Sequence, residues 1–335
     1  MSNAVDEELP PSTAPMPLSM TIGGLVDAEK ATEFANLVGG YIHLIGRALD
    51  VSRIDAVTIT DRYAEALAQV ERGFETQNVA THSQNEDIVG VAMCVHVIRE
   101  DMPKVHLVVE IEMLLPLWVS EPGSPEHARS LQLLAHECAH IEDLKRKDET
   151  SPGTILRERY ADEFEQMFAP VGSSMWEEYY ACRRTAHFDP SGGEPLVEAL
   201  LTCLDNNQGA IDDAIRRYRH HADLHQLIDE THDRAMRALR VAAYLIGHYD
   251  GLTQDWQTIP EVAERLKDHR LQPLLDDMTD ELRNLWDRRF DWTSSRETKG
   301  LNDIAWDAYV EAGVIARETL GGGLYLEVPF TAETL

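Results

Sequence analysis

The pentapeptide His-Glu-Cys-Ala-His at residues 136–140 constrains the fold of this chain more than any other feature. It lies in a segment, residues 126–147, whose apolar spacing predicts a long amphipathic helix. His136 and His140 are four residues apart and would project from the same helix face, so that their imidazoles could close on one metal ion. Glu137 would lie near enough to take a proton from water on that ion. The pattern therefore predicts one Zn²⁺ per chain, with Glu137 as a general base.

Short β-branched segments precede this helix. Residues 54–60 read IDAVTIT, and two more strand candidates, 88–98 and 104–114, are separated by the turn residues Asp101, Met102 and Pro103. We therefore expect a small sheet with a hairpin packed on the motif helix, followed by a mostly helical region, which is an α+β fold. The other expected elements are helices at 27–49, 61–70, 154–168, 174–186 and 301–320, further helices between 191 and 290, and a closing strand at 324–330.

The expected organisation has three parts. Residues 1–20 are rich in Pro, Ser and acidic residues and predict a disordered tail. Residues 21–190 would form the domain that carries the motif. The segment Asp-Pro-Ser-Gly-Gly that starts at residue 189 is the clearest break in the chain. Residues 191–335 would form a mostly helical C-terminal region of unknown role that ends in a short strand.

The charge composition disfavours two classes of partner, nucleic acids and anionic membranes. The 335 residues include 30 Lys+Arg and 59 Asp+Glu, which gives a formal net charge of −29. Such an acidic surface disfavours direct binding to nucleic acid or to anionic membranes. The first residues lack the features of a secretory signal, and no segment is apolar for long enough to predict a spanning helix. Four widely separated cysteines are typical of a reducing compartment, so we expect a cytoplasmic protein.

A catalytic zinc needs a third protein ligand. Glu158, in the string ERYAD, is the favoured candidate, because Asp162 would follow one helical turn later and could hold a ligand histidine through its second N–H. Glu178, in the string EYYA, is the alternative. A helical wheel does not decide between Glu158 and Glu178. The competing interpretation of Glu158 is a solvent-exposed carboxylate without a metal.

Other residues are candidates for supporting roles. Asp143 lies on the ligand face and could orient an imidazole, or could be a solvated acid at the helix end. Tyr179, Tyr180 or His187 could donate a hydrogen bond to an oxyanion, although aromatic residues on helices are more often core. The expected strand at 105–111 could pair with an extended substrate.

One further histidine cluster has two interpretations. His221, His225 and His232 fall on one stripe of a later helix. A second metal site needs such spacing, but a polar helix face produces the same pattern, and that is the more common case.

The string HECAH, followed by ERYADEF, resembles the gluzincin metallopeptidases, and within them the ImmA/IrrE-like group of bacterial cytoplasmic proteins. The resemblance covers residues 50–170. It implies a zincin-like domain, with His136, His140 and Glu158 as ligands, Glu137 as the base and Asp162 as a supporting acid. Glu165 and the residues after it depart from the usual motif of the group, and no DNA-binding helix-turn-helix is evident.

These observations predict a zinc-dependent metallopeptidase, a hydrolase whose substrate is a protein or peptide and in particular a regulatory protein. Two alternatives stay open. One is a non-catalytic zinc-binding sensor or interaction protein, against which the intact Glu137 argues. The other is an effector or toxin-like protease whose acidic helical half binds a regulatory partner.

Overall fold

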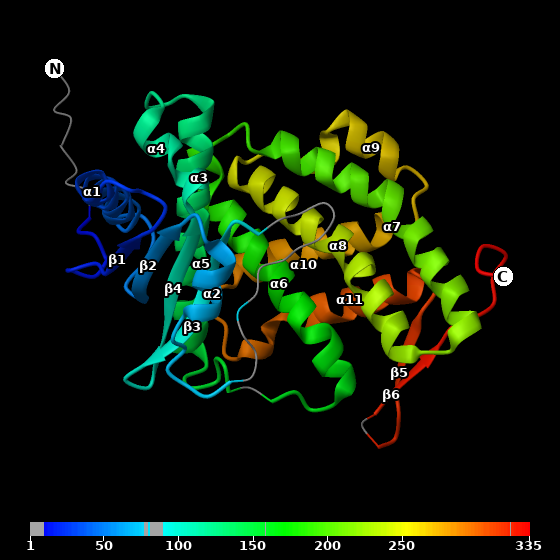
Figure 1. The fold of residues 1–335 in the computed structure, drawn as a ribbon. Helices are drawn as coiled ribbons and strands as arrows, with labels where there is room; N and C mark the ends of the chain where they lie inside the picture. The colour runs from blue at the N-terminus through cyan, green and yellow to red at the C-terminus, as the bar shows by residue number, and fades with distance from the viewer. Residues whose placement is uncertain (1–9, 77–79, 81–89, 158, 322) are drawn as a thin grey trace. The chain divides into compact units, whose positions relative to one another are not determined.

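The computed structural model of the protein describes residues 10–76, 80, 90–157, 159–321 and 323–335. The chain has the mixed α+β composition expected from the sequence. It contains two compact units, Met1–Leu156 and Arg157–Leu335 (Figure 1). None of the helices formed by the described residues combines the length and the apolar composition that crossing a bilayer requires.

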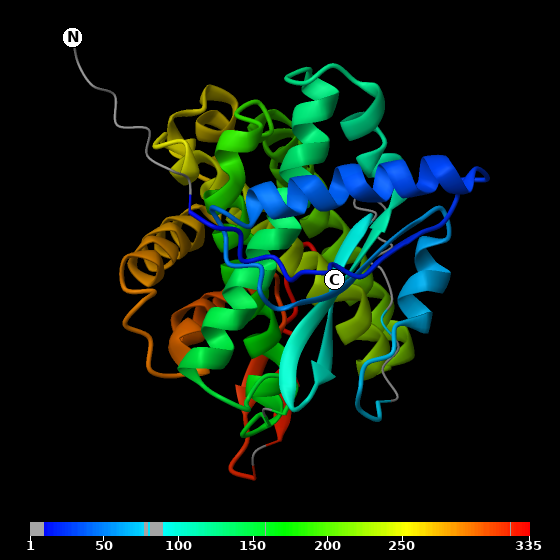
Figure 2. The ribbon, with the colours of Figure 1, turned by 90° about the vertical axis from the view of Figure 1, so that its left-hand side faces the viewer.

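The first unit contains a four-stranded sheet of order β1-β2-β4-β3. β1, β2 and β4 are parallel, and β3 is antiparallel to β4. Figure 2 shows the β3–β4 hairpin in cyan and α1 in blue. The strands are β1 (Met20–Ile22), β2 (Ile54–Thr60), β3 (Ala92–Arg99) and β4 (Met102–Glu110), and the helices are α1 (Ala28–Ile45), α2 (Tyr63–Gln69), α3 (Ile111–Leu114), α4 (Pro116–Val119) and α5 (Pro125–Thr150).

Different helices cover the two faces of this sheet. On one face Tyr63 of α2 packs with Val95 and Val108 in a buried apolar cluster. On the other face α5 packs against β3 and β4, and the Cys94 thiol donates a hydrogen bond to the backbone oxygen of Glu137, with S···O 3.3 Å. Cys94 and Val95 point to opposite faces because successive side chains of a strand alternate. The sheet therefore supports the motif helix directly.

The predicted strand at 54–60 and the predicted hairpin are confirmed, with some ends shifted. The hairpin turn falls on Glu100 and Asp101, whose φ angles are 52° and 63°, as two-residue hairpin loops favour. The second hairpin strand ends at Glu110, and the residues after it form α3. Residues 88–89 of the first hairpin strand lie outside the described residues. β4 lies between β2 and β3, so both its edges are hydrogen-bonded and its predicted pairing with a substrate is wrong.

Part of the expected disordered tail is ordered. The Thr13 hydroxyl donates to the backbone oxygens of Gly46 and Leu49 at 3.0 and 2.9 Å, and Ala14 is buried. β1 then pairs with β2. The polar composition of the segment did not reveal these contacts because they are made to backbone oxygens after the end of α1. Residues 1–9 of the expected tail lie outside the described residues.

The second unit is mostly helical, with a two-stranded antiparallel sheet near its C-terminus. One large apolar cluster forms its core and includes the fully buried Trp176, Trp256 and Tyr309. The helices are α6 (Glu163–Thr185), α7 (Gly193–His221), α8 (Leu224–Gly251), α9 (Pro260–Leu266), α10 (Gln272–Asp287) and α11 (Lys299–Glu311), with 3₁₀ turns at Ala186–Phe188, Trp256–Thr258 and Ser295–Thr298 and strands β5 (Ile315–Glu318) and β6 (Leu324–Glu327).

The helix α6 corrects two predictions. The sequence predicted separate helices at 154–168 and 174–186, but one helix begins at Glu163 and continues through Pro170. The described part of residues 154–162 is not helical, and the Leu156 backbone has a φ angle of 62°. A proline inside a helix costs about 3 kcal/mol. The packing of α6 against α8 and α11 offsets this cost.

Packing also sets the unit boundary and the C-terminal elements. The boundary lies between residues 156 and 157, earlier than the expected residue 190, because α6 packs within the second unit.

The C-terminal elements also differ from the prediction. The helix expected at 301–320 ends at Glu311, and Gly313, with a φ angle of 92°, precedes β5. β5 pairs with the predicted closing strand, β6. The Glu163 carboxylate accepts a hydrogen bond from the backbone N–H of Leu324 at 2.8 Å, which joins the start of α6 to β6.

Candidate metal centre

The motif histidines lie in the middle of α5, where the sequence placed them. The helix begins after Ser124, whose side chain accepts a hydrogen bond from the backbone N–H of His127 at 3.3 Å. Leu134 and Cys138 are buried on the face that packs into the first unit. The helix therefore presents its apolar face to the core, as the spacing predicted.

His136 and His140 face each other on α5. Their Nε2 atoms are 3.0 Å apart, and their ring planes are inclined at 85°. Both side chains are half-buried. Two ring nitrogens that converge in this way can bind one cation without a change of helix geometry.

Glu137 is buried, with 7% of its surface exposed. Burial raises the pKa of Tyr63, and the negative charges of Glu137, Cys94 and Glu110 raise it further. The Tyr63 hydroxyl therefore stays protonated near neutral pH, in the surroundings of the Glu137 carboxylate. Both residues belong to the first unit.

His136 and His140 offer two ligand atoms that could hold a metal ion, one Nε2 from each ring. Of the two candidates for the third ligand, Glu178 lies on α6 and is half-buried. The favoured Glu158 lies outside the described residues.

The structural argument that favoured Glu158 does not hold. It required Asp162 to follow one helical turn after Glu158, but none of the described residues between 151 and 162 is helical. The Asp162 carboxylate instead accepts a hydrogen bond from the backbone N–H of Glu165 at 2.7 Å and caps α6. The sequence contains a signal for this arrangement, because Asp162 and Glu165 have the spacing of a capping box.

Asp143, the other predicted supporting acid, is almost fully buried on α5, with 1% of its side chain exposed. Its carboxylate pairs with Arg146 at 2.5 Å and with Lys147 at 3.0 Å. Burial alone would raise its pKa, but Lys147 and Arg146 outweigh burial and lower the pKa to about 2. The interpretation of Asp143 as a solvated acid is therefore wrong.

The three residues predicted to donate a hydrogen bond to an oxyanion make contacts within the second unit. The Tyr179 hydroxyl is buried and donates to Asp250 at 2.8 Å. Burial and the charge of Asp250 raise the pKa of Tyr179, so it is held as a structural hydrogen-bond donor. Tyr180 packs against Trp176 in the core of the second unit. His187 lies in the 3₁₀ turn after α6, where partial burial and the charge of Arg184 lower its pKa.

The histidine stripe of the C-terminal region does not form a metal group. Across residues 10–76, 80, 90–157, 159–321 and 323–335, no set of three close ligand atoms includes His221, His225 or His232. His221 accepts a hydrogen bond from the backbone N–H of Asp223 at 2.9 Å. His232 packs against Phe168 and Tyr309. These histidines serve local structure.

The sequence did not single out Cys94 as a neighbour of Glu137. Strand alternation predicts which face of β3 carries Cys94, but it does not identify the residue of α5 that the thiol contacts.

Comparison with known proteins adds no family assignment: the chain matches no protein-family model, no curated protein and no solved structure at a significant level.

Proposed function

We propose that the protein is a zinc-dependent metallopeptidase with a zincin-like first unit, related in chemistry to the gluzincins that its motif resembles. His136 and His140 would be zinc ligands and Glu137 the general base, and we propose Glu178 as the third ligand because the helical spacing that favoured Glu158 is absent. The convergence of the two histidine Nε2 atoms, 3.0 Å apart, on the helix that carries the buried Glu137 carries the proposal. None of the four cysteines is in a disulfide, which agrees with action in a reducing compartment, and we propose that this is the cytoplasm.

The donor set fits zinc. Imidazole nitrogens and a carboxylate are typical ligands of catalytic zinc, and three protein ligands leave a fourth position for water. At bond lengths of about 2.1 Å, tetrahedral geometry separates neighbouring ligand atoms by about 3.4 Å. The two histidine nitrogens are 3.0 Å apart, close to that separation.

Zinc bound there would supply an acidified water and polarise the scissile carbonyl. Glu137 would take the proton from that water and deliver it to the leaving amine. The buried position of Glu137 supports this role, because limited access of bulk solvent strengthens electrostatic interactions with the reacting atoms. A purely structural zinc site would have no use for such a base.

The substrate would be a protein or peptide, because the proposed reaction is hydrolysis of a peptide bond. A regulatory protein is the substrate class suggested by the resemblance to the ImmA/IrrE-like group. The net charge of −29 favours substrates whose surfaces are neutral or basic near the cleaved bond.

The first test separates metal binding from catalysis. Purified protein should contain about one zinc per chain, and His136→Ala should lose it. Glu137→Gln should keep the zinc and lose at least about 100-fold in the rate of cleavage of unfolded casein or a peptide library. Zinc binding without cleavage by the wild type would favour a non-catalytic zinc-binding protein, and cleavage that Glu137→Gln leaves unchanged would show that Glu137 is not the base. Protein that stays metal-free in excess zinc would refute the proposal.

The third ligand is tested with a matched pair of variants. Glu178→Ala should reduce zinc affinity by at least about 100-fold, since it removes one of three protein ligands. Glu158→Ala serves as the control and should bind zinc as the wild type does. Competition with a chromophoric chelator measures both affinities. The reverse result would assign the ligand to Glu158.

A further inference from the structure

A small pocket lies within the second unit, between α7, α8 and α11. Leu204 and Ile211 of α7 form part of its apolar wall. Four buried alanines leave the space, because their side chains end at Cβ: Ala235 and Ala238 of α8, and Ala308 and Ala312 in and just after α11. The pocket therefore offers an apolar wall and room for a short hydrocarbon chain.

Two arginines line the same pocket. Arg234 comes from α8 and Arg270 from the loop before α10, whereas no aspartate or glutamate is among the described residues that line it. The chain as a whole has the opposite balance, with 59 acidic and 30 basic residues. The pocket is thus a positively charged site on an acidic protein, and it should attract an anion.

The Arg270 guanidinium has the capacity for a further partner. One of its N–H groups donates to the backbone oxygen of Glu311 at 2.7 Å, and a guanidinium has several more. Burial lowers the pKa of Arg270, and the charges of Asp212 and Glu311 offset this effect only in part. A carboxylate bound in the pocket would compensate the guanidinium through two parallel hydrogen bonds.

Asn207 offers a second donor from the buried side of the pocket. Its surface is only 7% exposed. Within the part of the chain that the structure describes, no atom accepts a hydrogen bond from its Nδ2. The next residue, Gln208, differs, because its amide donates to Asp212 at 2.6 Å. An unpaired buried amide destabilises a folded protein, so its presence in a pocket indicates a partner that arrives from solution.

We propose that this pocket is a binding site for a short-chain organic carboxylate. The carboxylate group would accept hydrogen bonds from Arg270 and Asn207, and the hydrocarbon part would contact the alanines. The apolar wall favours an organic acid over inorganic phosphate, because it could not hydrogen-bond the additional phosphate oxygens. The proposal goes beyond the hydrolase proposed above and does not depend on it, since every residue that it uses belongs to the second unit.

Butyrate is the probe for this site. Isothermal titration calorimetry of the full-length protein should give a Kd of about 1 mM or lower, as expected for a ligand of few atoms. Butyramide has the same chain without the charge and should bind at least about 10-fold more weakly, as should inorganic phosphate. His136→Ala should bind butyrate as the wild type does, which separates the pocket from coordination of butyrate to zinc.

Three results with the wild type would refute the proposal. Butyrate at about 10 mM would produce no binding signal, butyramide would bind as tightly as butyrate, or phosphate would bind more tightly than butyrate. The second result would show that the apolar wall acts without the arginines, and the third that the pocket accepts anions without regard to a hydrocarbon part.

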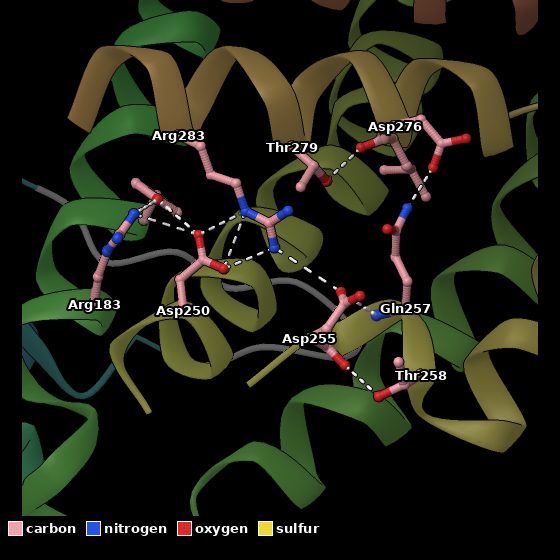
Figure 3. A network of polar contacts seen from close by, with 10 residues as sticks. Arg183, Asp250, Asp255, Gln257, Thr258, Asp276, Thr279 and Arg283 are labelled. Carbon is pink, nitrogen blue, oxygen red and sulfur yellow. Dashed lines mark hydrogen bonds and ion pairs between the residues drawn. The ribbon is translucent and has the colours of Figure 1, made fainter. Parts of the chain in front are cut away.

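Two matched pairs of variants locate the site. Asn207→Leu and Arg270→Lys should each weaken butyrate binding at least about 10-fold, because they remove the amide and the planar guanidinium. Gln257→Met and Arg283→Lys are the controls. Both of these side chains have their partners outside the pocket (Figure 3), and their substitution should leave the affinity for butyrate unchanged.

Asn207→Leu has a second measurement that distinguishes binding from structure. It removes an unpaired buried amide, so without butyrate its Tm should equal or exceed that of the wild type. A lower Tm together with wild-type affinity for butyrate would assign Asn207 to an internal water and overturn its role. If Asn207→Leu does not fold, Arg270→Lys decides, and wild-type affinity in that variant would overturn the proposal.

Discussion

A single buried carboxylate on the motif helix should couple the stability of the protein to pH. The pKa of Asp143 is lowered to about 2 from the ordinary value of 3.8. Its ion pairs with Arg146 and Lys147 therefore stabilise the fold fully above about pH 4, and this contribution is lost as the pH falls from about 4 to about 2.

We predict that Asp143→Asn lowers the free energy of unfolding by roughly 2 kcal/mol at pH 7. The difference from the wild type should fall to about half at pH 3, because the wild-type carboxylate is then partly protonated. Urea unfolding in the presence of a chelator measures it. Glu149→Gln, at an exposed position of the same helix, is the control and should change stability little. A difference that grows on acidification would contradict the prediction.

Residue-level prediction succeeded where spacing along one helix was sufficient. His136, Glu137 and His140 depend only on helical periodicity, and the structure places them as expected. The third ligand depends on which segment packs near that helix, and periodicity carries no such information. Glu178 and Glu158 both had acceptable helical surroundings on the wheel, so the sequence pattern could not choose between them.

At the scale of elements, prediction was best for strands and for helices with clear ends. The strand at 54–60 was placed without error, and the closing strand at 324–330 was found with a shorter extent. Errors arose where tertiary packing overrides local signals. The predicted gap between the helices at 154–168 and 174–186 is wrong, because α6 continues through Pro170. The capping pair Asp162 and Glu165, which marks the start of α6, lay inside the predicted helix at 154–168.

The contact between α6 and α8 gives a test with opposite signs. Gly247→Ala should lower the free energy of unfolding by about 1–3 kcal/mol, because its Cβ would meet the Tyr179 backbone at 2.5 Å. Gly209→Ala in α7, where a Cβ would meet nothing within 4 Å, should raise it by up to about 1 kcal/mol. Chemical denaturation of both variants measures the changes. If both substitutions raised the free energy of unfolding, α6 and α8 could move apart without loss of stability, and the prediction would be wrong.

At the scale of the whole molecule, the charge of −29 should destabilise the fold through mutual repulsion. Raising NaCl from about 0.01 to about 0.15 M shortens the Debye length from about 30 to about 8 Å. We therefore predict a gain of about 1 kcal/mol in stability, or a few degrees in Tm. Thermal unfolding with chelator measures this, and KCl at equal ionic strength controls for ion-specific effects. A fall in Tm would mean that favourable ion pairs dominate.

The attachment of α6 at both ends has a consequence for Glu178, the proposed third ligand. Asp162 and the Glu163–Leu324 contact hold the start of α6, and the hydrogen bond from Tyr179 to Asp250 holds its last turns. The backbone that carries Glu178 thus loses its conformational entropy when the chain folds, before any cation binds. Preorganisation of this kind should favour rapid and tight uptake, since little is left to be ordered at the moment of binding.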